Sequence, residues 1–161
     1  METVNINKEN ALKAYKSADK KTKELLENLF GKEILSQNIM DRIKTFEDAC
    51  NELEIKSISK NISFGFADSK DNESIEAYAK LCIIIRSLNE GWEPDWTNSN
   101  EYKYYPWFDS YKSGFGFSYS HYAYWYTITA CGSRLCFKSP ELAEYAGKQF
   151  LEIYNQFLTI K

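Results

Sequence analysis

Residues 92–126 read WEPDWTNSNEYKYYPWFDSYKSGFGFSYSHYAYWY, and this stretch decides the fold. It holds 15 of the 26 aromatic residues of the chain, together with two prolines and two glycines. Aromatic sequence interrupted by helix breakers favours strands and turns. Candidate strands are residues 102–109, 114–121 and 133–138, so we expect a small antiparallel sheet of about three strands.

Helical periodicity flanks this segment on its N-terminal side. Apolar residues recur at three- and four-residue steps over residues 8–30, 39–53 and 74–88, which predicts helices there. The first of these stretches reads as two short helices, or as one helix broken near Ser17. Gly31 and Gly91 follow the first and third stretches and provide helix stops.

On the C-terminal side, Ser139 and Pro140 form an N-cap and first-turn pair. The helix they start is expected to run to about residue 158. The predicted fold class is therefore α+β, with N-terminal helices, the small sheet, and the C-terminal helix packed on it. We expect a single domain over residues 1–161, with a helical part over about 8–90 and an aromatic, β-rich part plus the last helix over about 91–158.

Length and composition describe an ordinary folded domain. The chain has 161 residues, 43% of them apolar and 27% charged, which lies outside the disordered regime. We expect a cytoplasmic protein, because no basic and apolar leader opens the chain and the longest apolar run, residues 81–85, is far below the roughly 20 residues of a membrane span. Four cysteines in such a setting are expected to be free thiols.

The aromatic segment is the main candidate for a binding surface. Fifteen large rings exceed what a three-stranded sheet is expected to bury, so we predict an exposed patch that binds another protein. The residues proposed for ligand binding are Trp92, Asp95, Trp96, Tyr104 and Trp107. The alternative is that the same rings fill the core while the polar residues between them only make turns. Ligand identity and oligomeric state stay open at this point.

A nucleic-acid-binding or processing factor is the second hypothesis. It needs cations beside the rings, because neutralised phosphates supply most of the non-specific affinity. The candidate cations are Lys103, Lys112, Arg134, Lys138 and Lys148. The charge does not favour this role: the chain carries a net −3, and residues 92–126 hold two lysines against four acids.

The number and spacing of the candidate residues match no catalytic or metal-binding motif. His121 is the only histidine, and no nucleophile motif accompanies it. Cys131 and Cys136 are separated by four residues, which suits neither a zinc half-site nor a redox pair. A pair of carboxylates in an aromatic cleft is a further possibility, as in glycosidases. We therefore predict no catalytic residue, no metal and no cofactor.

Five stretches are distinctive when taken together: DRIKTFEDAC (41–50), LNEGWEPDW (88–96), YYPWF (104–108), GSRLCFKS (132–139) and ELAEYAGKQF (141–150). With them, the chain from about residue 8 to residue 158 resembles a group of small uncharacterised proteins of bacterial prophages and other mobile elements, often from gut anaerobes. The resemblance implies a mobile-element context and suits a binding or accessory protein. It brings no activity, cofactor or catalytic residue.

Overall fold

The structure is a computed structural model that describes residues 8–35, 38–55, 68–110 and 118–160. The chain divides into two compact units, residues 1–42 and residues 43–161, and each is described by itself. The sequence prediction of a single domain over 1–161 stays a prediction.

The first unit is helical. Its elements are α1 (Lys8–Ser17), α2 (Lys20–Phe30), α3 (Lys32–Leu35) and α4 (Ile39–Arg42). Asp19 separates the first two helices because its carboxylate accepts a hydrogen bond from the Thr22 backbone N–H at 2.9 Å, which caps α2. Gly31, with a φ of 84°, ends α2. The predicted break near Ser17 is confirmed, and of the two alternatives the structure shows two short helices.

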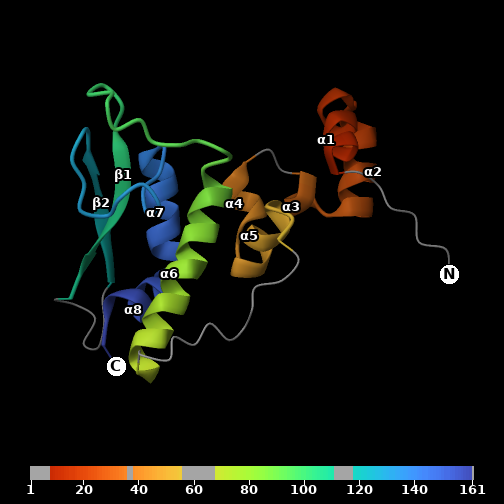
Figure 1. The fold of residues 1–161 in the computed structure, drawn as a ribbon. Coiled ribbons are helices and arrows are strands. Elements are labelled where there is room, and N and C mark those ends of the chain that lie inside the picture. The colour runs from red at the N-terminus through yellow and green to blue at the C-terminus, as the bar shows by residue number, and fades with distance from the viewer. Residues whose placement is uncertain (1–7, 36–37, 56–67, 111–117, 161) are drawn as a thin grey trace. The chain divides into compact units, whose positions relative to one another are not determined.

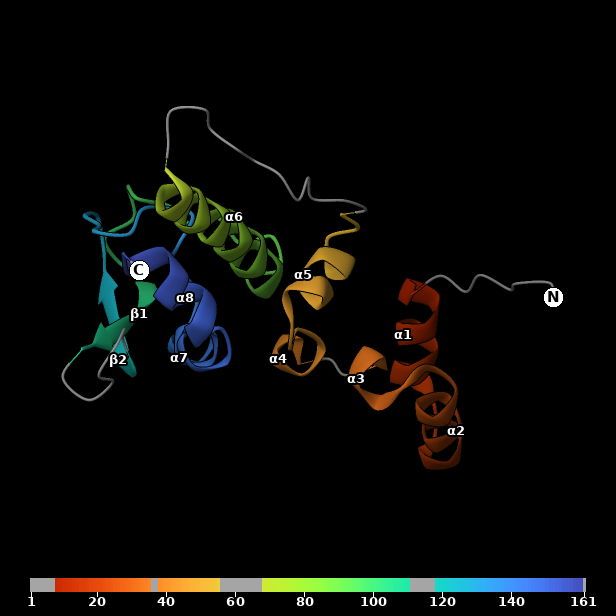
Figure 2. The same ribbon diagram turned by 90° about the horizontal axis from the view of Figure 1, so that it is seen from below.

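The second unit combines helices with a sheet. Its elements are α5 (Phe46–Glu52), α6 (Ser69–Leu88), β1 (Lys103–Asp109), β2 (Ser118–Trp125), α7 (Pro140–Gln149) and α8 (Leu151–Leu158). The two strands run antiparallel side by side, and α7 packs on both of them (Figure 1). The helices α5 and α8 both pack on α6 (Figure 2). The α+β class and the packing of a C-terminal helix on the sheet are confirmed.

The prediction of three strands is wrong for the described residues, where the sheet has two. The expected third strand, residues 133–138, makes a single bridge, in which Tyr104 and Phe137 exchange backbone hydrogen bonds of 3.0 and 2.7 Å. The next position along that edge of β1 is Pro106, which has no N–H to donate. At the other end of the bridge, Ser139 already caps α7. The ladder therefore stops after one pair.

The boundaries of the second strand also differ from the prediction. We expected residues 114–121, whereas β2 continues to Trp125, and residues 111–117 lie outside the described part of the chain. Its register places Tyr124 opposite Tyr104 and Tyr122 opposite Pro106. Four more residues of β2 therefore take part in the two faces of the sheet.

Two predicted helices are each broken into two. The stretch 39–53 is interrupted before α5, because Thr45 and Asp48 form a capping box: each side chain accepts a hydrogen bond from the backbone N–H of the other. The C-terminal helix is interrupted at Phe150, whose φ of −111° and ψ of 26° leave the helical region. The periodic apolar pattern continues through both breaks, so periodicity alone did not locate them.

Close packing positions α7 on the sheet. A Cβ atom on Gly147 would lie 2.8 Å from Cβ of Pro106 and would overlap the ring of Tyr119, so only glycine fits there. Pro106 and Tyr104 are two residues apart in β1 and thus share this face. The helix covers the part of the face around Pro106, while Lys103 and Tyr105 point to the opposite face.

Candidate functional site

One face of the sheet carries five tyrosine side chains that contact one another. This tyrosine cluster consists of Tyr102, Tyr104, Tyr122, Tyr124 and Tyr126. The ring centroid of Tyr102 lies 4.6 Å from that of Tyr126 and 4.9 Å from that of Tyr124. The ring centroids of Tyr104 and Tyr122 lie 5.8 Å apart. Most of these pairs are tilted or edge-to-face, which is the favoured geometry for aromatic rings.

Four of the five side chains in the cluster are exposed to solvent. Tyr102, Tyr122, Tyr124 and Tyr126 are 38–48% exposed, and Tyr104 is half-buried. The Tyr126 hydroxyl donates a hydrogen bond to the Tyr102 hydroxyl at 3.1 Å. This hydrogen bond is the main cause that raises the pKa of Tyr126 to about 12, and partial burial is the second cause. Burial raises the pKa of Tyr104, and the charge of Glu141 adds to that effect. The hydroxyls of Tyr104 and Tyr126 therefore stay protonated at physiological pH.

Sequence reasoning identified only Tyr104 in this cluster. The signal for the others was present as two alternating series, Tyr102 with Tyr104 and Tyr122 with Tyr124 and Tyr126, because residues two apart in a strand share a face. Because the second strand was predicted to end at residue 121, strand alternation was not applied to Tyr122, Tyr124 and Tyr126.

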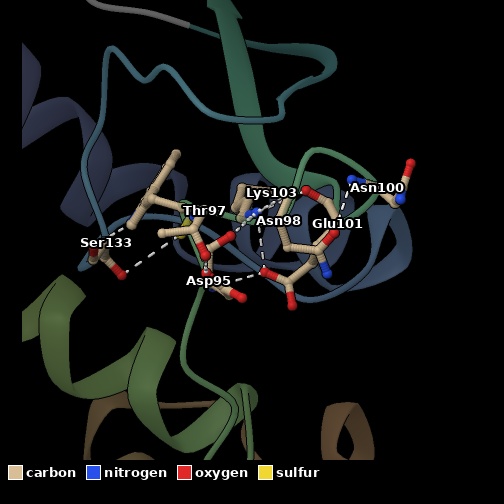
Figure 3. Close-up of polar contacts among 9 residues, drawn as sticks. Asp95, Thr97, Asn98, Asn100, Glu101, Lys103 and Ser133 are labelled. Atoms are coloured by element: carbon tan, nitrogen blue, oxygen red, sulfur yellow. Dashed lines mark hydrogen bonds and ion pairs between the residues drawn. The ribbon is translucent and has the colours of Figure 1, made fainter.

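The opposite face of β1 is organised around Lys103. Its side chain is only 1% exposed and lies inside the turn formed by residues 95–101 (Figure 3). The ammonium group donates to the backbone oxygens of Asp95, Glu101 (2.8 Å) and Asn98 (3.3 Å), and it lies 3.1 Å from Oε1 of Glu101. A buried ammonium is stable only with such a complete set of partners.

Asp95 and Trp96 belong to the same turn. The Asp95 carboxylate accepts hydrogen bonds from the backbone N–H and the hydroxyl of Thr97, at 2.9 and 2.7 Å, and these bonds lower the pKa of Asp95. The Trp96 ring lies under the Lys103 ammonium at 5.5 Å, and its indole N–H donates to Ser133 Oγ at 2.6 Å. Both side chains fix the turn in place.

The remaining two predicted ligand-binding residues lie elsewhere. Trp92 is half-buried and lines a pocket between the end of α6 and the loop that carries Arg134. Trp107 is 48% exposed and its ring lies 6.1 Å from that of His121, on the face opposite Tyr104. The structure therefore brings Asp95 and Trp96 together in one turn, whereas Tyr104 and Trp107 lie on opposite faces of β1 and Trp92 lines the pocket.

Most of the cations proposed for nucleic-acid binding form ion pairs with acidic side chains of this chain. Lys103 is buried in its turn, Lys138 pairs with Glu90 at 3.0 Å, and Lys148 pairs with Glu144. Lys112 lies outside the described residues. Arg134 is exposed and makes no ion pair within the described part of the chain.

The side chains that could serve in catalysis are the histidine, two cysteines and the acids of the aromatic segment. His121 is exposed, and among the described residues its ring makes one hydrogen bond, at 3.0 Å with the neighbouring Ser120 hydroxyl. Burial raises the pKa of Cys131, and it raises the pKa of Cys136 to about 12, so both are thiols at neutral pH. Across the ranges that the structure describes, no three metal-ligating side chains of the His, Cys, Asp and Glu types gather. The acids available for a carboxylate pair in residues 92–126 are Glu93, Asp95, Glu101 and Asp109. Of these, Glu101 pairs with Lys103, and Asp95 accepts a hydrogen bond from Thr97.

Comparisons with protein-family models, with curated proteins and with solved structures found no match to this chain. Within the described residues, no helix has both the length and the apolar character needed to cross a membrane.

Proposed function

We propose that this chain is a binding protein that holds another protein on its tyrosine cluster. The observation that carries the proposal is the exposure of four packed tyrosine rings on one face of a two-stranded sheet. Tyrosine supplies large, rigid contact area with few rotatable bonds, and it is enriched in protein interfaces. In line with the resemblance to mobile-element proteins, we place the chain as an accessory protein of a prophage or other mobile element.

The charge around the cluster indicates the chemistry of the partner. Glu141 lies close enough to Tyr104 to raise its pKa, and among the described residues no lysine or arginine lies over a ring of the cluster. Aromatic faces attract cations, most often the guanidinium of arginine. The partner we propose is therefore a protein segment that presents arginine or lysine beside apolar side chains.

The experiment is a selection of displayed random peptides on the wild-type protein, with the double variant Tyr102→Ser and Tyr124→Ser as a counter-selection. We expect enrichment of peptides that combine arginine or lysine with apolar residues. A synthetic peptide from the selection should lose at least about tenfold in affinity on Tyr124→Ser, since truncation of an interface tyrosine at a hot spot costs about 2 kcal/mol or more.

Trp107→Ser is the matched control, because Trp107 is as exposed as Tyr124 but lies on the other face. It should leave the affinity for the selected peptide unchanged. Equal enrichment on the wild-type protein and the double variant would contradict the proposal. A single-stranded oligonucleotide that binds with a steep salt dependence, insensitive to the tyrosine variants, would favour the nucleic-acid alternative instead.

A further inference from the structure

A second candidate site lies away from the tyrosine cluster, in a pocket of about 690 Å³ within residues 43–161. Three segments line it: α6, the loop that follows α6, and the loop around residue 132. Its size falls within the range of roughly 300–1,000 Å³ that holds small molecules. The lining residues that matter here are Tyr78, Cys82, Arg86, Trp92, Ser133 and Arg134.

Side-chain hydrogen bonds hold the walls of the pocket in place. The buried amide of Asn89 donates to the Cys136 backbone oxygen at 2.9 Å and accepts from the Lys138 backbone N–H at 3.1 Å, which ties the end of α6 to the second loop. Thr129 Oγ1 accepts from the backbone N–H of Gly132 at 2.9 Å. The indole of Trp96 donates to Ser133, as described above. The pocket is thus preformed.

Two guanidinium groups line this pocket without an acidic partner. Arg86 and Arg134 are both exposed, and neither makes an ion pair or hydrogen bond within the described ranges. Both side chains line the pocket together with Cys82. Burial raises the pKa of the Cys82 thiol, and the positive charges of both arginines partly offset that rise. Glu93 also lines it, which leaves the three charged side chains with a net charge of about +1 at neutral pH.

We propose that this pocket binds a small organic anion whose carboxylate or phosphate lies between Arg86 and Arg134 and whose flat body lies against Trp92. Guanidinium groups bind both anions through paired, charge-assisted hydrogen bonds. The Ser133 hydroxyl accepts from Trp96, so its own O–H is available to the ligand. The indole of Trp92 and the phenol of Tyr78 supply apolar surface for a planar group.

The test uses calorimetric titration of the full chain with adenosine monophosphate and, separately, with indole-3-acetate. Neutral adenosine and inorganic phosphate serve as probes of the two halves of the ligand. We expect at least one organic anion to bind, and adenosine to bind more weakly than adenosine monophosphate. Binding of adenosine monophosphate alone identifies a phosphate ligand, and binding of indole-3-acetate alone identifies a carboxylate ligand; either result supports the site.

Variants of the two arginines locate the binding. Arg86→Gln and Arg134→Gln should each weaken the anion at least about tenfold, because a hydrogen bond to a charged group contributes about 1.5–3 kcal/mol. Arg134→Lys keeps the charge but loses the planar fork, so it should also weaken binding. Lys148→Gln removes the same charge outside the pocket and should change nothing. Failure of both organic anions to bind, or affinities that ignore the arginine variants, would overturn the proposal.

Discussion

Two aromatic regions meet at β1 and use their rings in opposite ways. In the turn of residues 95–101, the Trp96 ring is fixed by a buried ammonium on one side and by a hydrogen bond to Ser133 on the other. In the tyrosine cluster, the rings contact one another, and four of the five are exposed. The first region holds the fold together, whereas the second offers a surface.

The difference depends on neighbouring residues of a single strand. Lys103 and Tyr104 are consecutive, and strand alternation sends their side chains to opposite faces. On one face the lysine is 1% exposed, while on the other face the paired Tyr124 is 48% exposed. Aromatic density in a sequence therefore says little about exposure until the faces are known.

The largest expected effect comes from removing the centre of the first region. Lys103→Met leaves three backbone oxygens and the Glu101 carboxylate without their cation, so we expect the free energy of unfolding to fall by about 3–5 kcal/mol. Denaturant unfolding measures this loss. The control is Lys148→Met, which breaks an exposed ion pair and should cost less than about 1 kcal/mol. Equal costs for the two variants would show that the buried ammonium does not organise the turn.

A pair of tyrosine truncations compares the two faces of the sheet directly. Tyr105 is 7% exposed, and its truncation to alanine should lower the free energy of unfolding by about 3 kcal/mol or more. Tyr124→Ala removes a side chain of the same size from the exposed face, and we expect a loss of about 1 kcal/mol. Thermal or denaturant unfolding of both variants decides the matter. A costly Tyr124→Ala would mean that the cluster serves mainly as core.

The smallest effect concerns ionisation within the cluster. The pKa of Tyr126 is raised from 10.0 to about 12, so its neutral form stabilises the fold fully below pH 10, and this contribution is lost as the pH rises from 10 to 12. The difference between the phenolate absorbance titrations of the wild-type protein and of Tyr126→Phe should show a step near pH 12. In Tyr102→Phe, which removes the hydrogen-bond partner, that step should move toward pH 10. If the difference between the wild-type and Tyr126→Phe titrations showed its step already at pH 10, the hydrogen-bonded pair would be contradicted.

Local patterns predicted much of the fold. Apolar periodicity located the helical stretches, the Ser139 and Pro140 pair located the start of α7, and the aromatic segment located β1. The errors arose where two local signals compete. The capping box at Thr45 and Asp48 interrupts a continuous apolar stripe, and Pro106 stops the third strand although the pattern of residues 133–138 permits one.

The candidate sites were predictable only in part. Trp92 and Arg134 were singled out separately, yet nothing in their spacing indicates that they line one pocket with Arg86. Lys103 was expected among surface cations, since lysine is seldom buried. Its burial requires three carbonyl oxygens that converge only when the turn closes.

The sequence by itself determined the α+β class, the aromatic β-rich segment, and the cap that starts α7, because these depend on interactions between residues close in the chain. Only the tertiary structure decided which rings are exposed and which charges are free. Those properties depend on which face α7 covers and on which backbone oxygens reach a side chain, and such contacts join residues that are distant in the sequence.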